Sequence, residues 1–468
     1  MVCINSTELK KIEIFQLDQN IDFTSLHRIN SKRYPFILES SAQAETLLSN
    51  KKINANQHAR FDILFAFPQE SVTLTSENNL NGDLIDDEKD FLSNLDINWK
   101  HNKNNITESY SSLPFTGGWF VYLSYDLAGQ IETRLRLPKS DKETIVAKLV
   151  RIPLAIIHDK VLDIQSIISE QKYKDNIHEI LNDIENLTSK GSCKSNLNLK
   201  EESPDKYISS ISKVKKYIKD GDVFQVNLSR LWQAEIDNKF DALSLYESLK
   251  KSNPAPFSAY VDFGEYKIIS SSPERLVKVD NRTVQTRPIA GTRARKNETS
   301  DDIENLKELI SHPKERAEHI MLIDLERNDL GRICMPGSIH VDELMVLESF
   351  QHVHHIVSNV SGELKDEITP GDVIRAVFPG GTITGCPKER CMQIIAELEA
   401  VPRGAYTGSL GYINHDGSMD LNILIRTFEV SNNLLSLRAG AGLVSDSIAE
   451  KELEETRAKA KGLIEALN

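Results

Sequence analysis

Runs of apolar residues along the chain predict that much of it forms β-strands. The runs follow one another across polar or glycine-containing segments and do not alternate strictly with helices. Strands in that order pair with their chain neighbours, so the pattern favours an α+β fold with antiparallel sheets. The predicted strands lie at residues 33–41, 61–67, 113–125, 146–157, 223–229, 258–263 and 266–271, with a hairpin around Gly264.

Apolar residues at a spacing of three and four predict helices between these strands. Pro204 and Pro313 each suit the first turn of a helix, where the missing backbone N–H of proline costs nothing, and Gly221 stops one of them. The predicted helices lie at residues 173–187, 204–220, 312–328 and 447–467.

One polar segment, residues 188–203, is low in hydrophobicity and typical of a linker. It separates an N-terminal region, residues 1–190, from a C-terminal region, residues 204–468. The chain of 468 residues can bury a large core, either as two ordinary domains or as one unusually large one.

Charge and composition exclude several kinds of partner. The formal net charge is −13 and no basic stripe is visible, so we expect no nucleic acid partner. No apolar run reaches the ~18 residues that span a bilayer and the first residues do not form a signal peptide, so we expect no membrane contact and a cytoplasmic protein. Five scattered cysteines disfavour disulfides, and Cys386 and Cys391 lack the spacing of a zinc site.

A glycine-rich loop at residues 378–387 precedes a predicted helix. A glycine pair and Gly385 allow tight bends, and Pro387 suits the first helical turn. Such a helix start presents free backbone N–H groups to an anion, and Lys388 would add a full charge. The Walker pattern of nucleotide-binding loops fails, because no Ser or Thr follows this lysine. A carboxylate or phosphate site and a plain connection both stay open.

Two predicted helices carry glutamate pairs beside their apolar faces: Glu315 and Glu318 in one, Glu452 and Glu455 in the other. Like charges one turn apart repel by about 0.2–0.5 kcal/mol even when exposed. A solvated rim of charges would explain either pair alone. Four convergent carboxylates would instead suit Mg²⁺, which prefers a few carboxylates with water and substrate oxygens, better than Zn²⁺.

Three single residues are further candidates. Glu274 follows a predicted strand and could donate a proton if its pKa were raised, although a solvated turn residue is an equal reading. His355 lies among apolar residues, where a core histidine is the default. Arg426 lies inside an apolar strand and needs either an internal carboxylate or an anionic ligand.

Together these motifs resemble the chorismate-utilising enzymes, which comprise the synthase subunits of anthranilate and 4-amino-4-deoxychorismate formation and the isochorismate and salicylate synthases. The similarity is strong over residues 203–467 and weak before them. The segments that carry it occur in the family's order: Gln225-Val-Asn-Leu-Ser-Arg230, Ser272-Pro-Glu-Arg275, Arg287-Pro-Ile-Ala-Gly-Thr-Arg293, residues 315–332, Val353-His-His-Ile-Val-Ser358, the glycine-rich loop, Ile425-Arg-Thr427 and residues 452–459.

The resemblance implies a large two-sheet antiparallel β sandwich flanked by helices, with both regions of the chain in one intertwined unit. It implies that Glu318 and Glu455 bind Mg²⁺ directly, that Glu315 and Glu452 support it, and that the metal holds the ring carboxylate of chorismate. Glu274 would protonate the leaving hydroxyl. The other catalytic residues it implies are His355, Gln225, Thr292 and Lys459. The substrate contacts it implies are Thr384, Gly385, Tyr406, Arg426, Gly440, Ala441, Gly442 and Lys459.

The family members that activate water carry a lysine where this chain has Gln225. An uncharged amide cannot take a proton from water, so ammonia is the expected nucleophile. The sequence shows no glutamine-hydrolysing Cys/His module. The resemblance therefore implies a separate glutamine amidotransferase subunit that forms a heterodimer with this chain and supplies ammonia.

Residues 378–385 and 255–260 are more similar to aminodeoxychorismate synthase component I, which indicates 4-amino-4-deoxychorismate, on the route to para-aminobenzoate and folate, as the product. Ala290 favours the alternative, anthranilate synthase component I, because many aminodeoxychorismate synthases have a lysine there. An inactive regulatory homologue is the non-enzyme alternative, and its expected loss of the metal glutamates is not seen. The candidate tryptophan pocket of the family corresponds to Glu39, Ser40, Pro256 and Phe257.

Overall fold

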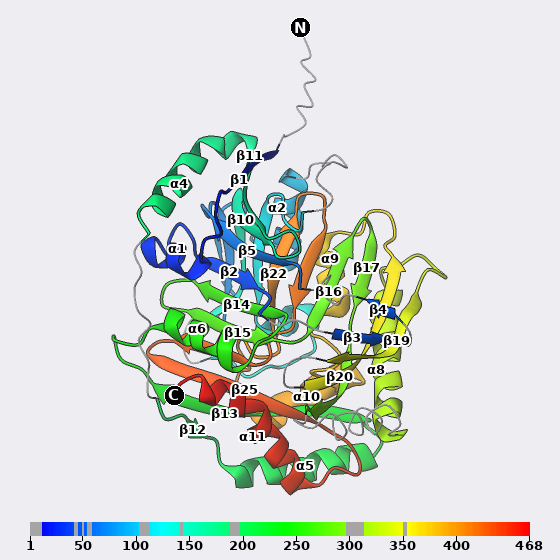
Figure 1. Ribbon diagram of the computed structural model, residues 1–468. Coiled ribbons are helices and arrows are strands. Elements are labelled where there is room, and N and C mark those ends of the chain that lie inside the picture. The colour runs from blue at the N-terminus through cyan, green and yellow to red at the C-terminus, as the bar shows by residue number, and fades with distance from the viewer. Residues whose placement is uncertain are drawn as a thin grey trace.

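Two large antiparallel sheets form the centre of the computed structural model, with helices on their outer faces (Figure 1). The structure describes residues 12–41, 45–48, 51–53, 59–102, 113–140, 144–187, 197–295, 313–349 and 353–468. The two-sheet α+β sandwich expected from the sequence is confirmed.

The first sheet, called sheet A, has 12 strands in the described part of the chain. In spatial order they are β1 (Ile12–Gln16), β11 (Ile164–Glu170), β10 (Leu154–Asp159), β5 (Phe61–Ala66), β2 (Phe36–Glu39), β14 (Phe257–Asp262), β15 (Lys267–Ser272), β24 (Thr427–Ser431), β25 (Leu434–Leu443), β13 (Gln225–Glu235) and β12 (Lys200–Glu201), with β21 (Gly385–Cys386) also paired to β13.

The second sheet, sheet B, has 13 strands within the same described ranges. Their order is β4 (Lys51–Ile53), β3 (Glu45–Leu48), β19 (His340–Ser349), β20 (Val353–Glu363), β17 (Thr283–Thr286), β16 (Arg275–Asp280), β23 (Met419–Asn422), β22 (Ser409–Asn414), β8 (Gly118–Leu123), β9 (Ile145–Ile152), β6 (Ser71–Thr75) and β7 (Leu80–Gly82), with β18 (Ile289–Ala294) paired to β20.

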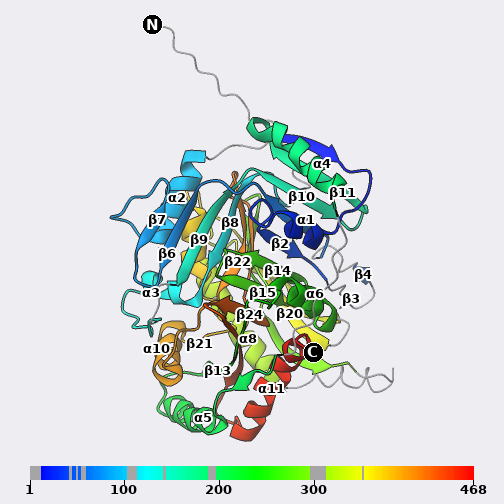
Figure 2. The ribbon, with the colours of Figure 1, turned by 90° about the vertical axis from the view of Figure 1, so that its left-hand side faces the viewer.

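Helices cover both outer faces and one end of the sandwich (Figure 2). The α-helices are α1 (Phe23–Ile29), α2 (Phe91–Asn102), α3 (Ala128–Ile131), α4 (Ile177–Glu185), α5 (Pro204–Lys219), α6 (Ala242–Ser252), α8 (Pro313–Gly331), α9 (Pro370–Val377), α10 (Lys388–Glu399) and α11 (Ala449–Glu465), and the 3₁₀-helices are η3 (Tyr125–Leu127) and η4 (Gln171–Asn176).

Both sheets combine strands from the two regions of the chain. In sheet A, β2 pairs with β14 so that Ile37 lies opposite Tyr260. In sheet B, β8 pairs with β22 so that Val121 lies opposite Gly411. The backbone ladders therefore run continuously across the two regions.

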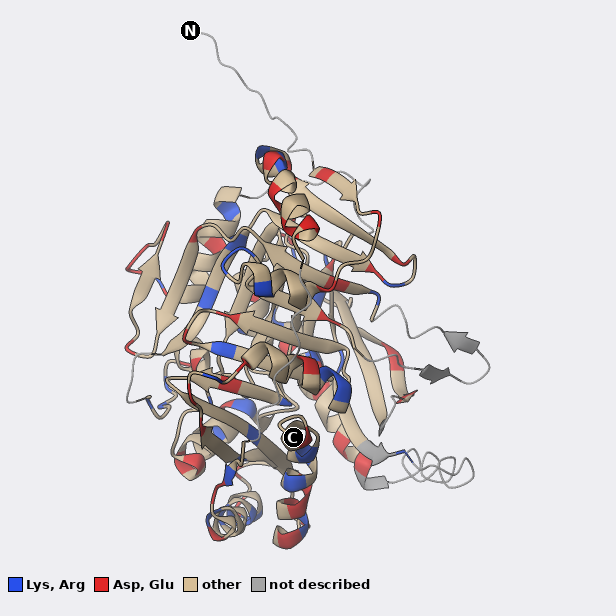
Figure 3. Cartoon of the chain, turned by 60° about the vertical axis from the view of Figure 1, so that its left-hand side comes forward, with Lys and Arg blue, Asp and Glu red and all other residues tan. Residues whose placement is uncertain are grey.

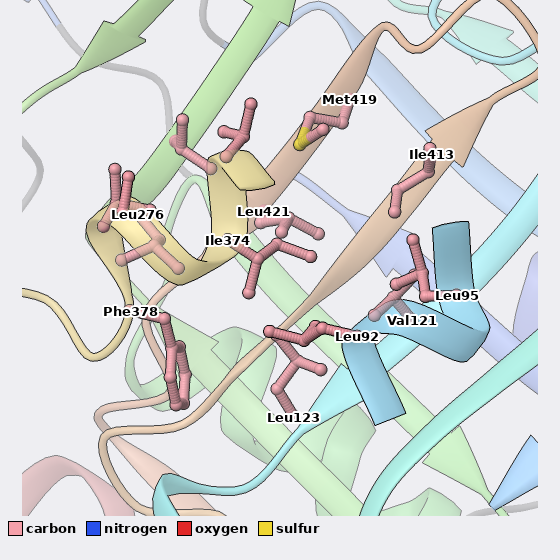
Figure 4. Packing of buried hydrophobic residues seen from close by; sticks show 14 of the residues in the cluster. Leu92, Leu95, Val121, Leu123, Leu276, Ile374, Phe378, Ile413, Met419 and Leu421 are labelled. Atoms are coloured by element: carbon pink, nitrogen blue, oxygen red, sulfur yellow. The ribbon is translucent and has the colours of Figure 1, made fainter. Parts of the chain in front are cut away.

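The hydrophobic core has one inner and two outer layers. The inner layer joins the sheets, and its aromatic rings include Phe36 of sheet A stacked on Phe120 of sheet B at 4.1 Å between centroids. On the outer face of sheet B, Leu92 of α2 and Ile374 of α9 pack toward Leu421 (Figure 4). Helices α1, α4, α6 and α11 cover sheet A in the same way. Each buried leucine or isoleucine contributes roughly 1.5–3 kcal/mol.

The predicted helices and the hairpin of β14 and β15 are found, with two differences in detail. Residues 146–157 form two strands, β9 and β10, because Pro153 between them has no N–H to donate to a continuous ladder. The helix expected at residues 173–187 begins as the 3₁₀-helix η4 before it becomes α4. Residues 188–196 of the predicted linker lie outside the described residues.

Acidic and basic residues are interspersed along the chain, as on the helix α11 near the C-terminus (Figure 3). Of the helices in the described ranges, none combines the length and apolar character that crossing a bilayer requires.

Candidate active site

Two glycines on β25 are the point at which the predicted site residues meet. Gly440 lies beside the hydroxyl of Tyr406, which would be 2.8 Å from a Cβ at that position, and its carbonyl oxygen accepts a hydrogen bond of 3.0 Å from Nζ of Lys459. A Cβ on Gly442 would lie 2.4 Å from Nε2 of Gln225. A Cβ on Gly440 would also lie 2.8 Å from the backbone oxygen of Leu228, whereas a side chain on Gly442 would displace the amide of Gln225.

Gln225, at the start of β13, is 4% exposed. Its side chain is oriented by Glu318, one of the glutamates predicted to bind Mg²⁺. Its Nε2 donates a hydrogen bond of 2.8 Å to Oε1 of Glu318 on α8. Its carbonyl oxygen Oε1 is buried and has no hydrogen-bond partner among the described residues. A buried acceptor left unpaired costs about 1–3 kcal/mol, which a donor on a ligand would offset.

The glycine-rich loop is held against β13 by its backbone. Gly385 has φ of +131°, and a Cβ there would lie 2.1 Å from the carbonyl oxygen of Gln225. The hydroxyl of Thr384 is turned inward and donates to the carbonyl oxygen of Gly380 at 2.9 Å. The backbone carbonyl oxygen of Thr384 accepts a hydrogen bond of 2.9 Å from the backbone N–H of Asn227. The loop is therefore rigidly positioned beside the amide of Gln225.

The expected contribution of Lys388 to an anion site is wrong. Its Nζ lies 2.5 Å from Oδ2 of Asp329 on α8, and both side chains are almost fully buried. A buried ammonium group is most stable next to a carboxylate, so this charge is neutralised inside the protein. The lysine ties α10 to α8 instead.

Glu274, between β15 and β16, is a buried carboxylic acid. Burial raises the pKa of Glu274 to about 7, although the hydroxyl of Thr382, which donates to Oε1 at 2.8 Å, a backbone hydrogen bond from Ile289 and the charge of Lys459 favour the ionised form. A group with a pKa near neutrality is half protonated at pH 7, as a general acid requires.

His355 on β20 is a buried neutral imidazole. Burial lowers the pKa of His355 to about 3, and the nearby charges of Arg426 and His354 act in the same direction. Thr292 pairs with His355 across β18 and β20, but its side chain lies outside the described residues. Ala290, two residues earlier on β18, is 7% exposed.

Arg426 directly precedes β24 and does not lie inside the strand, as the sequence had suggested; its backbone has φ of +54°. Burial lowers the pKa of Arg426, while the nearby Tyr406 opposes this shift. In the described part of the chain no carboxylate forms an ion pair with this guanidinium. A deeply placed cation without a counter-ion favours an anionic ligand.

One glutamate of each predicted pair, Glu318 on α8 and Glu455 on α11, lies near β25. Oε1 of Glu318 would lie 3.7 Å from a Cβ on Gly442, and Oε1 of Glu455 is 2.8 Å from Nζ of Lys459, which contacts Gly440. Across the described residues, however, no group of three His, Cys, Asp or Glu side chains comes close enough to hold a metal ion. The oxygen donors suit Mg²⁺, which completes its octahedral shell with water and substrate oxygens. The metal role of Glu315, Glu318, Glu452 and Glu455 stays a prediction.

A separate cavity of about 800 Å³ lies beside the predicted tryptophan-pocket residues Glu39, Pro256 and Phe257, which line it. Glu39 accepts hydrogen bonds from Tyr246 at 2.6 Å and from Lys250 at 2.7 Å, so its charge is already paired. Ser40 is held by its backbone to Asp62 and Lys160. The binding of tryptophan in this cavity stays a prediction.

Sequence reasoning missed a buried ion cluster beneath Tyr406. Glu399 accepts from Arg403 at 2.7 Å and from Arg438 at 2.8 Å, and all three side chains are almost fully buried. Arg403 also donates to the carbonyl oxygen of Ile383 at 3.1 Å, which joins the cluster to the glycine-rich loop. The signal in the sequence was Arg438, a single cation in the apolar strand that also carries Gly440.

A sequence model of the family described as chorismate binding enzyme matches residues 34–465. This chain belongs to that family. The match covers nearly the full length of the chain, and chorismate is the compound on which the chain acts.

The proteins similar to this chain carry the names of two different enzymes, anthranilate synthase and aminodeoxychorismate synthase. The chain is 42% identical to an anthranilate synthase component I-like protein of Synechocystis sp. over 367 residues, which cover 78% of this chain and 75% of that protein. It is 46% identical to aminodeoxychorismate synthase component 1 of Bacillus subtilis over 263 residues, which cover 56% of each. The crystal structure of anthranilate synthase component I from Streptococcus pneumoniae has a TM-score of 0.77 at 32% identity, covering 90% of this chain and 94% of that one.

Proposed function

We propose that this chain catalyses the Mg²⁺-dependent amination of chorismate by ammonia to 4-amino-4-deoxychorismate. The observation that carries the proposal is the amide of Gln225, whose NH₂ is tied to Glu318 and whose buried oxygen lacks a partner among the described residues. That oxygen can accept an N–H of ammonia, but the amide cannot take a proton from water.

The remaining side chains suit a dianionic substrate. Arg426, Tyr406 and Lys459 offer donors to its two carboxylates, and the neutral His355 lies near Arg426. Glu274 gives its proton to the departing C4 hydroxyl, which leaves as water, and ammonia forms the new C–N bond. The proton that the nitrogen then loses restores the acid form of Glu274. When bound, Mg²⁺ would neutralise the ring carboxylate and assist departure of the hydroxyl. Glu318 and Glu455 would hold it, with Glu315 and Glu452 in support.

One residue, Ala290, favours a different product from the same substrate. Ala290 offers no amine for covalent attack on the substrate ring, and the Synechocystis relative carries an anthranilate synthase name. Anthranilate with release of pyruvate is therefore the second candidate. The word component in the relatives' names supports a partner, which we propose to be a glutamine amidotransferase subunit that delivers ammonia.

The test is a product assay with the purified chain, chorismate, MgCl₂ and ammonium chloride, followed by chromatography, mass spectrometry and a lactate dehydrogenase assay for pyruvate. We expect a product that retains the enolpyruvyl group and no pyruvate. Fluorescent anthranilate with one equivalent of pyruvate would establish the second candidate. Isochorismate, the product of water attack, would contradict the role of Gln225. The variant Gln225→Lys should shift the products toward water attack.

A further inference from the structure

Two carboxyl groups that have no part in the proposed reaction accept hydrogen bonds from the turn before Tyr406. Asp126, in η3 after β8 of sheet B, accepts the backbone N–H of Gly404 with Oδ2 at 3.2 Å. Glu429, on β24 of sheet A, accepts the backbone N–H of Ala405 with Oε2 at 2.8 Å. Consecutive peptide groups of one turn are thus held by acids from opposite sheets.

The turn is fixed from other directions as well. The carbonyl oxygen of Gly404 accepts the backbone N–H of Tyr125 at 2.9 Å. Gly404 has φ of +60°, and a Cβ there would lie 2.5 Å from Oε2 of Glu429, so the carboxyl lies directly against the backbone. The next residue, Tyr406, places its hydroxyl at Gly440 in the candidate active site. The position of that hydroxyl therefore depends on how firmly the turn is held.

We propose that Asp126 and Glu429 are positioning residues that clamp the Gly404–Ala405 turn, and that the clamp stays closed only while at least one of the two carboxyls is protonated. Two carboxylates bound to adjacent amides repel each other when both ionise, as in other close carboxylate pairs. Opening the clamp would move Tyr406 and weaken chorismate binding. The inference rests on the proposed contact of Tyr406 with the substrate.

The surroundings of the two carboxyls favour their protonated forms. Burial raises the pKa of Asp126 to about 7, and the charge of Glu429 adds to this, while Arg438 and backbone N–H groups of residues 403 and 404 oppose it. Burial also raises the pKa of Glu429, against the hydrogen bonds from Ala405 and Tyr266 and the charge of Arg438. Oδ1 of Asp126 is enclosed and has no hydrogen-bond partner in the described part of the chain.

Among the described residues, few cations face the pair. Arg438 on β25 is the main one, and it is already bound to Glu399. Tyr122 on β8 and Tyr266 hydrogen-bond to each other at 2.6 Å on the other side, and burial raises the pKa of both. Lys148 on β9 lies over the ring of Phe263 at 5.2 Å, and burial lowers its pKa. The environment thus compensates for one negative charge better than for two.

The test compares the full-length wild type with Asp126→Asn and Glu429→Gln, which keep the acceptor oxygen but cannot ionise. Calorimetric titration with chorismate at pH 6.5 and pH 9 should show a rise in Kd that is at least threefold larger in the wild type than in either variant, because Glu274 ionises over the same range in all three proteins and adds the same effect to each. Asp163→Asn, at an exposed turn, is the control and should keep the wild-type ratio. Equal ratios in the wild type and both clamp variants would overturn the proposal.

A second readout does not need chorismate. A carboxyl with a raised pKa contributes stability that is fully present below its unfolded value near 4 and is lost as the pH rises through the folded value near 7. The Tm of the wild type should therefore fall more between pH 5 and pH 8 than that of Asp126→Asn. If the wild type binds no chorismate, the proposed function fails, and this Tm comparison still decides the clamp, since parallel curves would overturn it.

Discussion

The hydroxyl of Thr382 is expected to set the pH range in which the enzyme works. It donates to Glu274 at 2.8 Å and so favours the ionised carboxylate, against the burial that raises the pKa of Glu274 to about 7. A hydrogen bond to a charged group is worth roughly 1.5–3 kcal/mol, and one pKa unit corresponds to about 1.36 kcal/mol. Thr382→Val should therefore raise the pKa of Glu274 by about one unit or more.

The shift has a definite sign. Glu274 acts as the protonated acid, so activity is present below its folded pKa and is lost as the pH rises through it. At an ordinary carboxyl pKa only roughly 0.3% of the group would be protonated at pH 7, whereas a pKa near 7 leaves about half. The alkaline limb of the rate profile should thus lie near pH 7 in the wild type and near pH 8 or above in Thr382→Val.

The assay measures kcat/KM for chorismate between pH 5.5 and 9.5 at a constant concentration of free NH₃, since ammonia itself titrates in this range. The matched control is Thr384→Val in the same loop, because the Thr384 hydroxyl donates to a backbone carbonyl and not to Glu274. An alkaline limb that stays in place or moves to lower pH in Thr382→Val would refute the assignment of Glu274 as the acid.

Three further substitutions test other parts of the site. Glu318→Gln should abolish Mg²⁺-dependent turnover, measured by Mg²⁺ titration, whereas Glu454→Gln on the exposed side of α11 should leave it unchanged. Arg426→Met should raise the KM for chorismate by about 10²-fold, the loss of one charged contact of roughly 2.7 kcal/mol, without lowering the Tm; a normal KM would exclude the contact. Glu399→Gln should cost about 3–5 kcal/mol in urea unfolding, because it leaves Arg403 in a buried cluster with excess positive charge, and a change below 1 kcal/mol would contradict this.

Local signals predicted the elements of the fold well. Pro313 and the helical spacing of apolar residues defined α8, and the glycine between two apolar runs defined the hairpin of β14 and β15. The signals extend over a few residues and depend on backbone preferences, so they survive in the folded chain. Helix boundaries were less certain from the pattern, because terminal turns fray. The break at Pro153 was missed, although the missing N–H of proline is a local signal.

The partners of the site residues could not be predicted in this way. Gln225 and Glu318 are 93 residues apart in the chain, and the local pattern around either does not contain the other. Lys388 was expected to face a ligand, but the buried Asp329 neutralises it, which only the packing of α10 against α8 reveals. Thr382, the donor to Glu274, lies in a loop whose sequence indicated tight bends and either an anion site or a plain connection, but no contact with Glu274. The resemblance to a family supplied residue roles, and the contacts that modulate those roles came from the structure.

The interleaving of early and late strands has a consequence for synthesis of the chain on the ribosome. Strands β2 and β8 emerge early, but their neighbours β14 and β22 are translated roughly two hundred or more residues later. Until then, edges of both sheets are open and prone to pairing with other chains. Loss of the last segments through a premature stop would therefore remove interior strands as well as the site, and such products should aggregate or be degraded.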